Sequence, residues 1–391
     1  MRTTSLTLLV TTLLVAPLAA EGQEKLPRRP ELPAAADTND ANAYFQYGMM
    51  RLVRHPTEAA DAFYWATRLS PAWADPYYGR RTALLMARRN MLWGYFTGQR
   101  GIVNSRQVRS IDSLAKEALI RNPFYAARFD LLLIEEALRH EYGPTAYLDR
   151  MRSGDAALDA MIAYGDGRYR AAVDLYGQAL KRRPREFGYR LPRARAFFHL
   201  LELDSAANEM TLLLEEMRKR DDKTLVYFYD SKEVLEYSLG RVYYLLDRND
   251  DARAALGRAL EEDLSFYMAH VDLAEIALKQ GDTTTALSEL SLAVELRAAD
   301  AAVRLRYGDA LVAAGMLDDA VAQYRAAIEH EPYFAQPYFE LARALDLQGN
   351  AREAVEQYRA FLARSARNRA EIAAAQERIT ALADSERGSP P

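Results

Sequence analysis

The sequence predicts an all-α protein built as a solenoid of stacked antiparallel helical hairpins. Three observations support this prediction. Four consecutive blocks of 34 residues run in register over residues 233–368. Small residues recur at positions 8 and 20 of every block, and a large residue follows at position 24. Glycine stands at position 15 of three blocks, where a first helix would end. A fixed period of this length is typical of a helical repeat array.

Each block has a physical interpretation as two helices joined by a turn. Positions 20, 24 and 27 are spaced i, i+4 and i+7, so Ala320, Tyr324 and Ala327 share one helix face. A small-large-small row lets a second helix approach closely. Gly315 ends the first helix and Pro332 ends the second. Because one hairpin cannot bury both of its apolar faces, neighbouring hairpins must stack around a continuous core.

This pattern resembles the tetratricopeptide repeat, whose period is also 34 residues. The block 301–334 carries the marks of that repeat at Gly308, Leu311, Gly315, Ala320, Tyr324, Ala327 and Pro332. The resemblance covers residues 41–368, closely over 153–220 and 233–368 and loosely over 75–152. It implies a right-handed superhelix in which the first helix of each repeat lines a concave groove.

The N-terminus has the pattern of an export signal. Residues 1–20 hold Arg2, an apolar run of about 15 residues and small residues before the expected cleavage after Ala20. Cleavage after Gly22 and retention as an uncleaved anchor are the alternatives. Residues 21–40 are rich in proline and mixed charge, which predicts a disordered linker. We therefore expect an exported protein, periplasmic or extracellular.

Residues 41–152 are expected to form divergent helical repeats, with a first hairpin near 41–71 and a second that begins near Asp75. An insertion at 91–106 interrupts the second hairpin and carries Trp93, Tyr95 and Phe96. Exposed aromatic side chains would be costly in water. The insertion therefore either folds back onto the solenoid or contacts a partner or a membrane.

The remaining segments follow the repeat frame. Residues 153–220 predict two repeats, and the insert 221–232 is expected to lengthen the first helix of the next one. Four repeats then fill 233–368. Residues 369–384 form an amphipathic pattern that predicts a capping helix, and residues 385–391 predict a disordered tail.

The sequence contains no recognisable catalytic constellation. It has no cysteine, which excludes disulfides and thiolate chemistry. No two of its five histidines lie three or four residues apart, so no helical zinc motif exists. We expect no enzyme activity, no cofactor and no metal. The histidines are His55, His140, His199, His270 and His330.

Charge is unevenly distributed along the chain. Residues 233–391 hold 27 acidic and 17 basic residues, whereas the rest of the chain holds 34 basic and 28 acidic residues. The strongest local signal is the basic run 181–195, which predicts either a solvated turn or a patch for an anionic partner, such as an acidic protein, a glycan or a lipid head group. The basic run consists of Lys181, Arg182, Arg183, Arg185, Arg190, Arg193 and Arg195.

The resemblance also implies which residues line the concave groove, at positions 2, 5, 9 and 12 of each first helix. In this sequence those positions combine apolar residues with charges of both signs, which suits an extended or helical protein segment. The hypothetical partner-binding residues are Tyr237, Arg241, Tyr244, Val271, Glu275, Leu305, Asp309, Phe339 and Arg343. The predicted function is a non-enzymatic scaffold for a protein partner and not for nucleic acid. The alternative is a periplasmic link in polysaccharide export or outer-membrane assembly.

Overall fold

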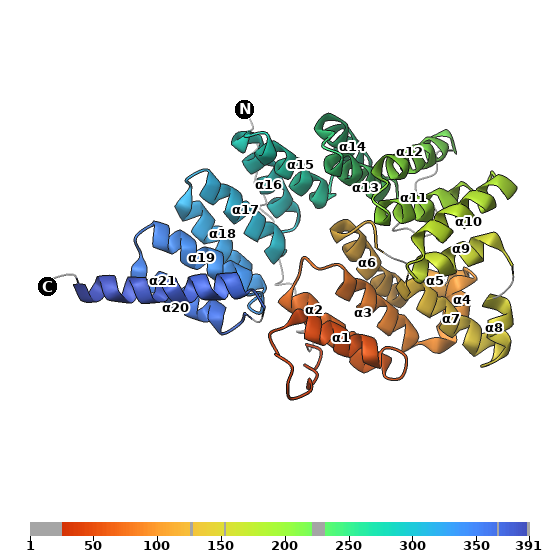
Figure 1. The fold of residues 1–391 in the computed structure, drawn as a ribbon, viewed down its shortest axis with the longest axis horizontal. Helices are drawn as coiled ribbons and strands as arrows, with labels where there is room; N and C mark the ends of the chain where they lie inside the picture. The colour runs from red at the N-terminus through yellow and green to blue at the C-terminus, as the bar shows by residue number, and fades with distance from the viewer. Residues whose placement is uncertain (1–25, 126–127, 152–153, 221–230, 366, 389–391) are drawn as a thin grey trace, which may run out of the picture.

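The computed structural model describes residues 26–125, 128–151, 154–220, 231–365 and 367–388. Within these residues the regular structure is helical, with no β-strand, and consecutive helices pair as antiparallel hairpins that curve into a superhelical arc (Figure 1). The prediction of an all-α solenoid is confirmed. The predicted signal and its cleavage at Ala20 lie outside the described residues, as do residues 221–230 of the insert and the end of the tail.

The N-terminal half contains the divergent hairpins and the first two regular repeats. Its helices are α1 (Ala41–Arg51), α2 (Pro56–Leu69), α3 (Asp75–Met86), α4 (Arg89–Phe96), α5 (Arg100–Val103), α6 (Arg106–Arg121), α7 (Arg128–Tyr142), α8 (Ala146–Met151), α9 (Ala156–Gly165), α10 (Tyr169–Arg182), α11 (Arg190–His199) and α12 (Leu203–Arg220). A short 3₁₀ turn, η1 (Phe187–Tyr189), precedes α11.

The C-terminal half contains the four regular repeats and a final helix. Its helices are α13 (Lys232–Leu245), α14 (Asn249–Glu262), α15 (Tyr267–Lys279), α16 (Thr283–Leu296), α17 (Ala301–Ala313), α18 (Leu317–His330), α19 (Gln336–Leu347), α20 (Ala351–Leu362) and α21 (Arg369–Gly388). Ser231 is extended at the start of α13, so the insert does not lengthen that helix as expected. The final helix packs on α20, in the place of the predicted cap.

Close approach of the two helices in each hairpin depends on the small residue at position 8. A Cβ atom built on Gly240 would lie 2.9 Å from Leu256 Cγ, the residue at position 24 of the same block. A Cβ atom built on Gly308 would overlap the ring of Tyr324 in the same way. Position 24 therefore fills the space that position 8 leaves open, as the spacing predicts.

The turn between the helices of a repeat imposes a left-handed backbone at position 15. Glycine occupies this place in four repeats, at Gly167, Gly281, Gly315 and Gly349, with φ near +77°. The other two regular repeats place Leu201 and Asp247 there, at φ of 61° and 60°. The turn geometry is therefore kept even where the sequence supplies a side chain that disfavours it.

The aromatic insertion folds back onto the solenoid, which was one of the two alternatives. Helix α4 packs on α7, and the ring of Trp93 meets that of Tyr142 edge-on at 5.5 Å. Tyr95 is buried, and its hydroxyl donates to Asp112 and accepts from Arg81. The rings that prompted the idea of a partner or membrane contact are thus used inside the fold.

The expectation of a disordered linker is wrong for residues 26–40, which we call the N-terminal strap. Its Pro27 carbonyl accepts a hydrogen bond of 3.1 Å from the Trp65 indole nitrogen. The guanidinium of Arg29 stands over Trp65 at 4.8 Å and over Tyr333 at 5.7 Å. Proline-rich composition suggested disorder, but cation–π contacts and one buried indole donor hold the strap in place.

The two ends of the solenoid meet, so that α2 and α6 lie beside the turns of the C-terminal repeats (Figure 1). We call this contact the seam. On one side it is formed by the strap and the ends of α2 and α6, and on the other by the start of α13 and the turns that precede α15, α17 and α19. Its ion pairs are Arg68–Glu331, Arg121–Asp300, Arg297–Glu117, Lys116–Glu233, Lys116–Asp263 and Arg367–Asp40. Four of these six join a base from the N-terminal half to an acid from the C-terminal half, which gives the uneven charge a structural role.

Replacing Leu201 with glycine should stabilise the protein. The side chain of Leu201 is 81% exposed and contributes little packing, while its left-handed backbone costs about 1 kcal/mol. We expect Leu201→Gly to raise the free energy of unfolding by about 1 kcal/mol, measured by urea denaturation. Leu264, 80% exposed and without a positive φ, is the matched control. A gain at Leu264→Gly as large as at Leu201→Gly would contradict the explanation.

Candidate protein-binding surfaces

The predicted groove positions share one surface, which we call the inner face. It is formed by α13, α15, α17 and α19 together with α21, and it carries two pockets that are lined by the C-terminal repeats and α21. The predicted residues divide between a covered end at α13 and an open stretch from α15 to α21.

The covered end is occupied by the protein's own chain. Tyr237 is fully buried, and its hydroxyl donates a 2.8 Å hydrogen bond to the carbonyl of Ile120 at the end of α6. Phe266 packs against its ring at a centroid distance of 5.1 Å. Tyr237 is therefore a seam residue and not an open groove position, which corrects the hypothesis that it contacts a partner.

Arg241 and Tyr244 are likewise engaged with α15. Arg241 donates to Asp272 at 2.9 Å, and the Tyr244 hydroxyl donates to Glu275 at 3.1 Å. Burial raises the pKa of Asp272 to about 6, although Arg241 opposes the shift. The second carboxylate oxygen of Asp272 is buried without a hydrogen-bond donor. Charge at this end of the inner face is thus partly neutralised within the protein.

A pocket of about 320 Å³ opens between α15 and α17. Its floor is apolar and its rim is charged, and three of the predicted residues, Val271, Glu275 and Asp309, belong to it. The other lining residues are Ala274, Leu278, Leu290, Arg306, Ala310 and Ala313. Small side chains in the floor create the space.

A second pocket of about 260 Å³ lies between α19 and α21 and includes the predicted residues Phe339 and Arg343. Arg378 forms a two-pronged pair with Asp346 at 2.8 and 2.9 Å on its rim. The remaining predicted residue, Leu305, is partly buried and packs against the core of the last repeats. These residues lie on one face of the array, as their helical spacing predicts.

The predicted set missed several lining residues. Arg306 and Ala313 stand at positions 6 and 13, which adjoin the predicted positions on the same helix face, so the helical period could have found them. Arg378 lies in the final helix outside the repeat frame, and no sequence signal placed it.

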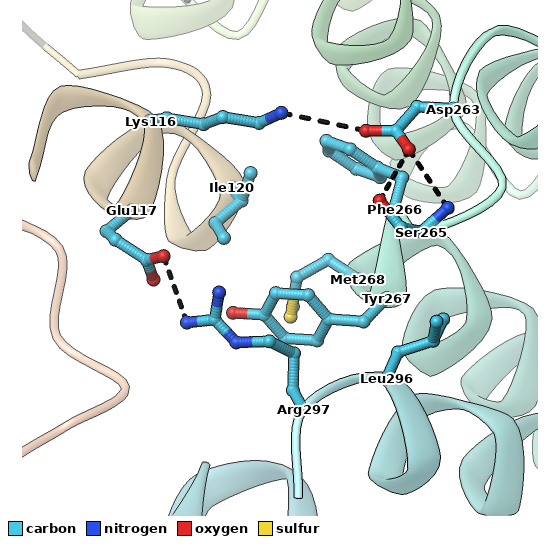
Figure 2. A pocket seen from close by; sticks show the side chains of 10 residues that line it. All are labelled: Lys116, Glu117, Ile120, Asp263, Ser265, Phe266, Tyr267, Met268, Leu296 and Arg297. Atoms are coloured by element: carbon cyan, nitrogen blue, oxygen red, sulfur yellow. Dashed lines mark hydrogen bonds and ion pairs between the residues drawn. The ribbon is translucent and has the colours of Figure 1, made fainter. Parts of the chain in front are cut away.

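The seam contains a further pocket of about 320 Å³ between α6 and the start of α15 (Figure 2). Figure 2 shows Lys116 directed toward Asp263, at 3.6 Å, and Arg297 directed toward Glu117, at 2.9 Å. Arg297 also stands over the ring of Tyr267 at 4.9 Å. All four charged side chains are thus satisfied by one another across the seam.

Beside this pocket, a buried charge network links the two halves. Arg121 pairs with Glu117 at 2.7 Å and with Asp300 at 3.1 Å, and the Arg121 and Asp300 side chains are only 8% and 7% exposed. Burial would raise the pKa of Glu117, but Arg121 and Arg297 outweigh it and hold the pKa below its ordinary value. Burial raises the pKa of Tyr77, which faces Arg121, to about 12.

The basic run 181–195 does not form a single patch. Arg190 and Arg193 both pair with the buried Glu209, at 2.7 and 2.6 Å, and Arg195 donates to the carbonyl of Pro123. Arg183 pairs with Asp155 at 3.0 Å. Lys181, Arg182, Arg183 and Arg185 are exposed, whereas Arg190, Arg193 and Arg195 are partly buried. Three of the seven basic side chains are thus held within the fold, so the run does not present a seven-residue anionic-partner patch.

Comparisons with known proteins agree with this architecture. Residues 158–215, 237–303 and 305–370 match the tetratricopeptide repeat family. The chain is a helical-repeat solenoid and belongs to the tetratricopeptide repeat family. No catalytic family is indicated. No curated protein sequence matches the chain.

Several solved structures are similar to part of this chain at low sequence identity. YrrB, described as a tetratricopeptide repeat protein with an unusual peptide-binding site, is 21% identical over 51% of this chain and 97% of its own, with a TM-score of 0.39. PilW, described as a type IV pilus biogenesis factor, is 20% identical over 53% of this chain and 91% of its own, with a TM-score of 0.42. The C-terminal part of a tetratricopeptide repeat protein from Cytophaga hutchinsonii is 14% identical over 57% of this chain and 93% of its own, with a TM-score of 0.45. At these values the likenesses say nothing about what this chain binds.

Two further findings concern the described part of the chain. None of its helices combines the length and the apolar character that crossing a bilayer requires. In the same residues, no group of three or more histidine and carboxylate side chains is arranged to hold a metal ion.

Removing Arg121 should open the seam. Arg121→Ala leaves Glu117 and Asp300 without their shared buried cation, and we expect a loss of about 3 kcal/mol in the free energy of unfolding. Small-angle scattering should show a larger radius of gyration as the ends separate. Arg352→Ala, at a side chain 89% exposed, is the control and should change stability by less than about 0.5 kcal/mol. An unchanged radius and stability for Arg121→Ala would contradict the role of the network.

Asp272 should make stability depend on pH. Because its folded pKa of about 6 lies above that of an unfolded aspartate, the folded state binds the extra proton between about pH 4 and 6. Its contribution to stability therefore falls as the pH rises through that window. Asp272→Asn keeps an acceptor for Arg241 and removes the titration. Denaturation at pH 4.5, 6 and 7.5 should show the stability of the variant improving relative to wild type as the pH rises, whereas a constant difference would refute the assignment.

Proposed function

We propose that this protein is an exported, non-enzymatic scaffold that holds a segment of a partner protein on the open stretch of its inner face, from α15 to α21. The observation that carries the proposal is the pair of open pockets at the predicted groove positions. Both pockets combine an apolar floor with fixed charges, which suits side-chain anchoring and the selection of register. Membership of the tetratricopeptide repeat family supports a role in protein interaction.

Export rests on the N-terminal pattern alone. The basic Arg2, the apolar run and the small residues before Glu21 support passage through a secretion system. A cell-fractionation experiment with antibody detection, compared with a variant that lacks residues 2–20, tests this part of the proposal separately from binding.

The structure does not support the two observations on which the alternative role in polysaccharide export or outer-membrane assembly was based. That role depended on an exposed aromatic insertion and on a continuous basic patch. Helix α4 covers its aromatic side chains against α7, and three of the seven basic side chains of the run are held within the fold.

Filling the pocket between α15 and α17 should block partner binding. Ala313 is exposed at the pocket edge, so Ala313→Trp can occupy the space with little cost to packing. We expect at least a tenfold loss of affinity for the segment that the wild-type protein binds, which corresponds to about 1.4 kcal/mol of binding free energy. Such a segment can be selected from a random peptide display library and measured by fluorescence anisotropy.

The neighbouring residue gives a matched control. Ala314 is exposed, ends α17 and does not line the pocket, so Ala314→Trp adds the same bulk one residue away. It should leave the affinity within about twofold, since it fills no binding space. Equal losses for both variants, or none for Ala313→Trp, would argue against the inner face as the binding site.

A further inference from the structure

The pocket between α15 and α17 has features that select one kind of side chain, and the inference drawn from them rests on the proposed function. Its floor is formed by Val271, Ala274 and Leu278 from one helix and by Ala310 and Ala313 from the other. These apolar side chains offer a surface against which an aliphatic stem can pack. The charged residues that line the same pocket are two carboxylates, Glu275 and Asp309, and one arginine, Arg306.

Both carboxylates are accessible and held in position. The Glu275 side chain is 39% exposed and accepts a hydrogen bond of 3.1 Å from Tyr244. Asp309 is also exposed and accepts one of 2.8 Å from the buried Tyr324. Each tyrosine hydroxyl donates to one oxygen of its carboxylate and so fixes the orientation of that side chain. The remaining lone pairs are free to meet a ligand without a further loss of side-chain freedom.

The carboxylates lack a full complement of positive charge. Arg306 lies 3.6 Å from Glu275 and is itself 49% exposed, so this pair is weak. Arg343 is engaged by Glu340 at 2.7 Å, and no described arginine or lysine forms an ion pair with Asp309. Partial desolvation raises the pKa of Asp309, and Tyr324, Arg343 and Arg306 only partly oppose this shift. A cation that entered the pocket would relieve this imbalance.

We propose that the pocket between α15 and α17 binds a lysine or arginine of the partner segment, with the aliphatic stem along the floor and the cationic tip between Glu275 and Asp309. Charge complementarity identifies the occupant, since an acidic or purely apolar side chain would leave the two carboxylates without a counter-charge. The neighbouring pocket between α19 and α21 carries Arg343 and Arg378, and its one carboxylate, Asp346, is paired with Arg378.

The test uses the full chain and a display library of random 12-residue peptides. Peptides selected on wild type should share a lysine or arginine at one position. Changing that residue to methionine, which keeps the aliphatic stem, should weaken binding about tenfold or more. Selected peptides without a shared basic residue would overturn the proposal.

A double variant tests the two carboxylates directly. Glu275→Gln with Asp309→Asn removes both charges and keeps an acceptor for each tyrosine hydroxyl, so folding is preserved. We expect the basic peptides to bind at least tenfold more weakly to it, and the methionine versions to bind equally to both proteins. The control is Glu295→Gln with Glu329→Gln, two exposed acids on the second helices of the same repeats, which makes the same change in net charge.

The outcomes separate this inference from the proposed function. If Ala313→Trp abolishes binding but the neutral double variant binds as wild type does, the inner face is the site and the cationic anchor is wrong. If no peptide is selected, or if the selected peptides tolerate Ala313→Trp, the proposed function fails and the inference falls with it. Equal weakening by the control variant would show that net charge alone is responsible, which would also overturn the anchor.

Discussion

Close contact between a small residue on the first helix and a large residue on the second is the interaction on which the rest of the structure depends. The ring of Tyr324 packs against Gly308, and the side chain of Leu256 packs against Gly240. These contacts set the distance between the helices of a hairpin, and therefore the angle at which one hairpin meets the next. Repeated along the chain, a fixed angle produces the curvature that brings the two ends together.

Contacts across the seam hold the two ends of the curved array together. Its buried network around Arg121 would be costly if any member lacked a partner, because each ion has been removed from water. The opposite net charges of the two halves favour the encounter, and the aromatic rings around Arg29 cover its edge. Stability and shape are thus coupled in a way that an open solenoid, in which each repeat contacts only its neighbours, does not provide.

Closure also decides which part of the inner face is available. The end of α6 covers Tyr237, so the surface at α13 has become part of the protein's interior. From α15 onward the same repeat positions remain open and form two pockets with different charge. The pocket between α15 and α17 carries two carboxylates and one arginine, whereas the pocket between α19 and α21 carries two arginines and one carboxylate. The repeats are equivalent in their packing positions, but they differ at the positions that face the ligand.

The sequence by itself determined the helical hairpins of the regular repeats and the face on which the groove residues lie, because these follow from spacings within 34 residues. It placed Val271, Glu275, Asp309, Phe339 and Arg343 on one face through the helical period alone. It failed where the interaction is distant. Composition predicted disorder for the strap, because its prolines and mixed charges form no periodic apolar pattern. The contacts that order it come from residues distant in the sequence.

Only the tertiary structure decided what those residues contact. Asn39 donates to the carbonyl of Ala363, a residue 324 positions away, and no local pattern encodes such a pair. The burial of Tyr237, the internal pairing of the basic run and the joining of Arg378 to the second pocket arise in the same way. They depend on the accumulated curvature of the whole array, which is the sum of many small packing angles and cannot be obtained from any single repeat.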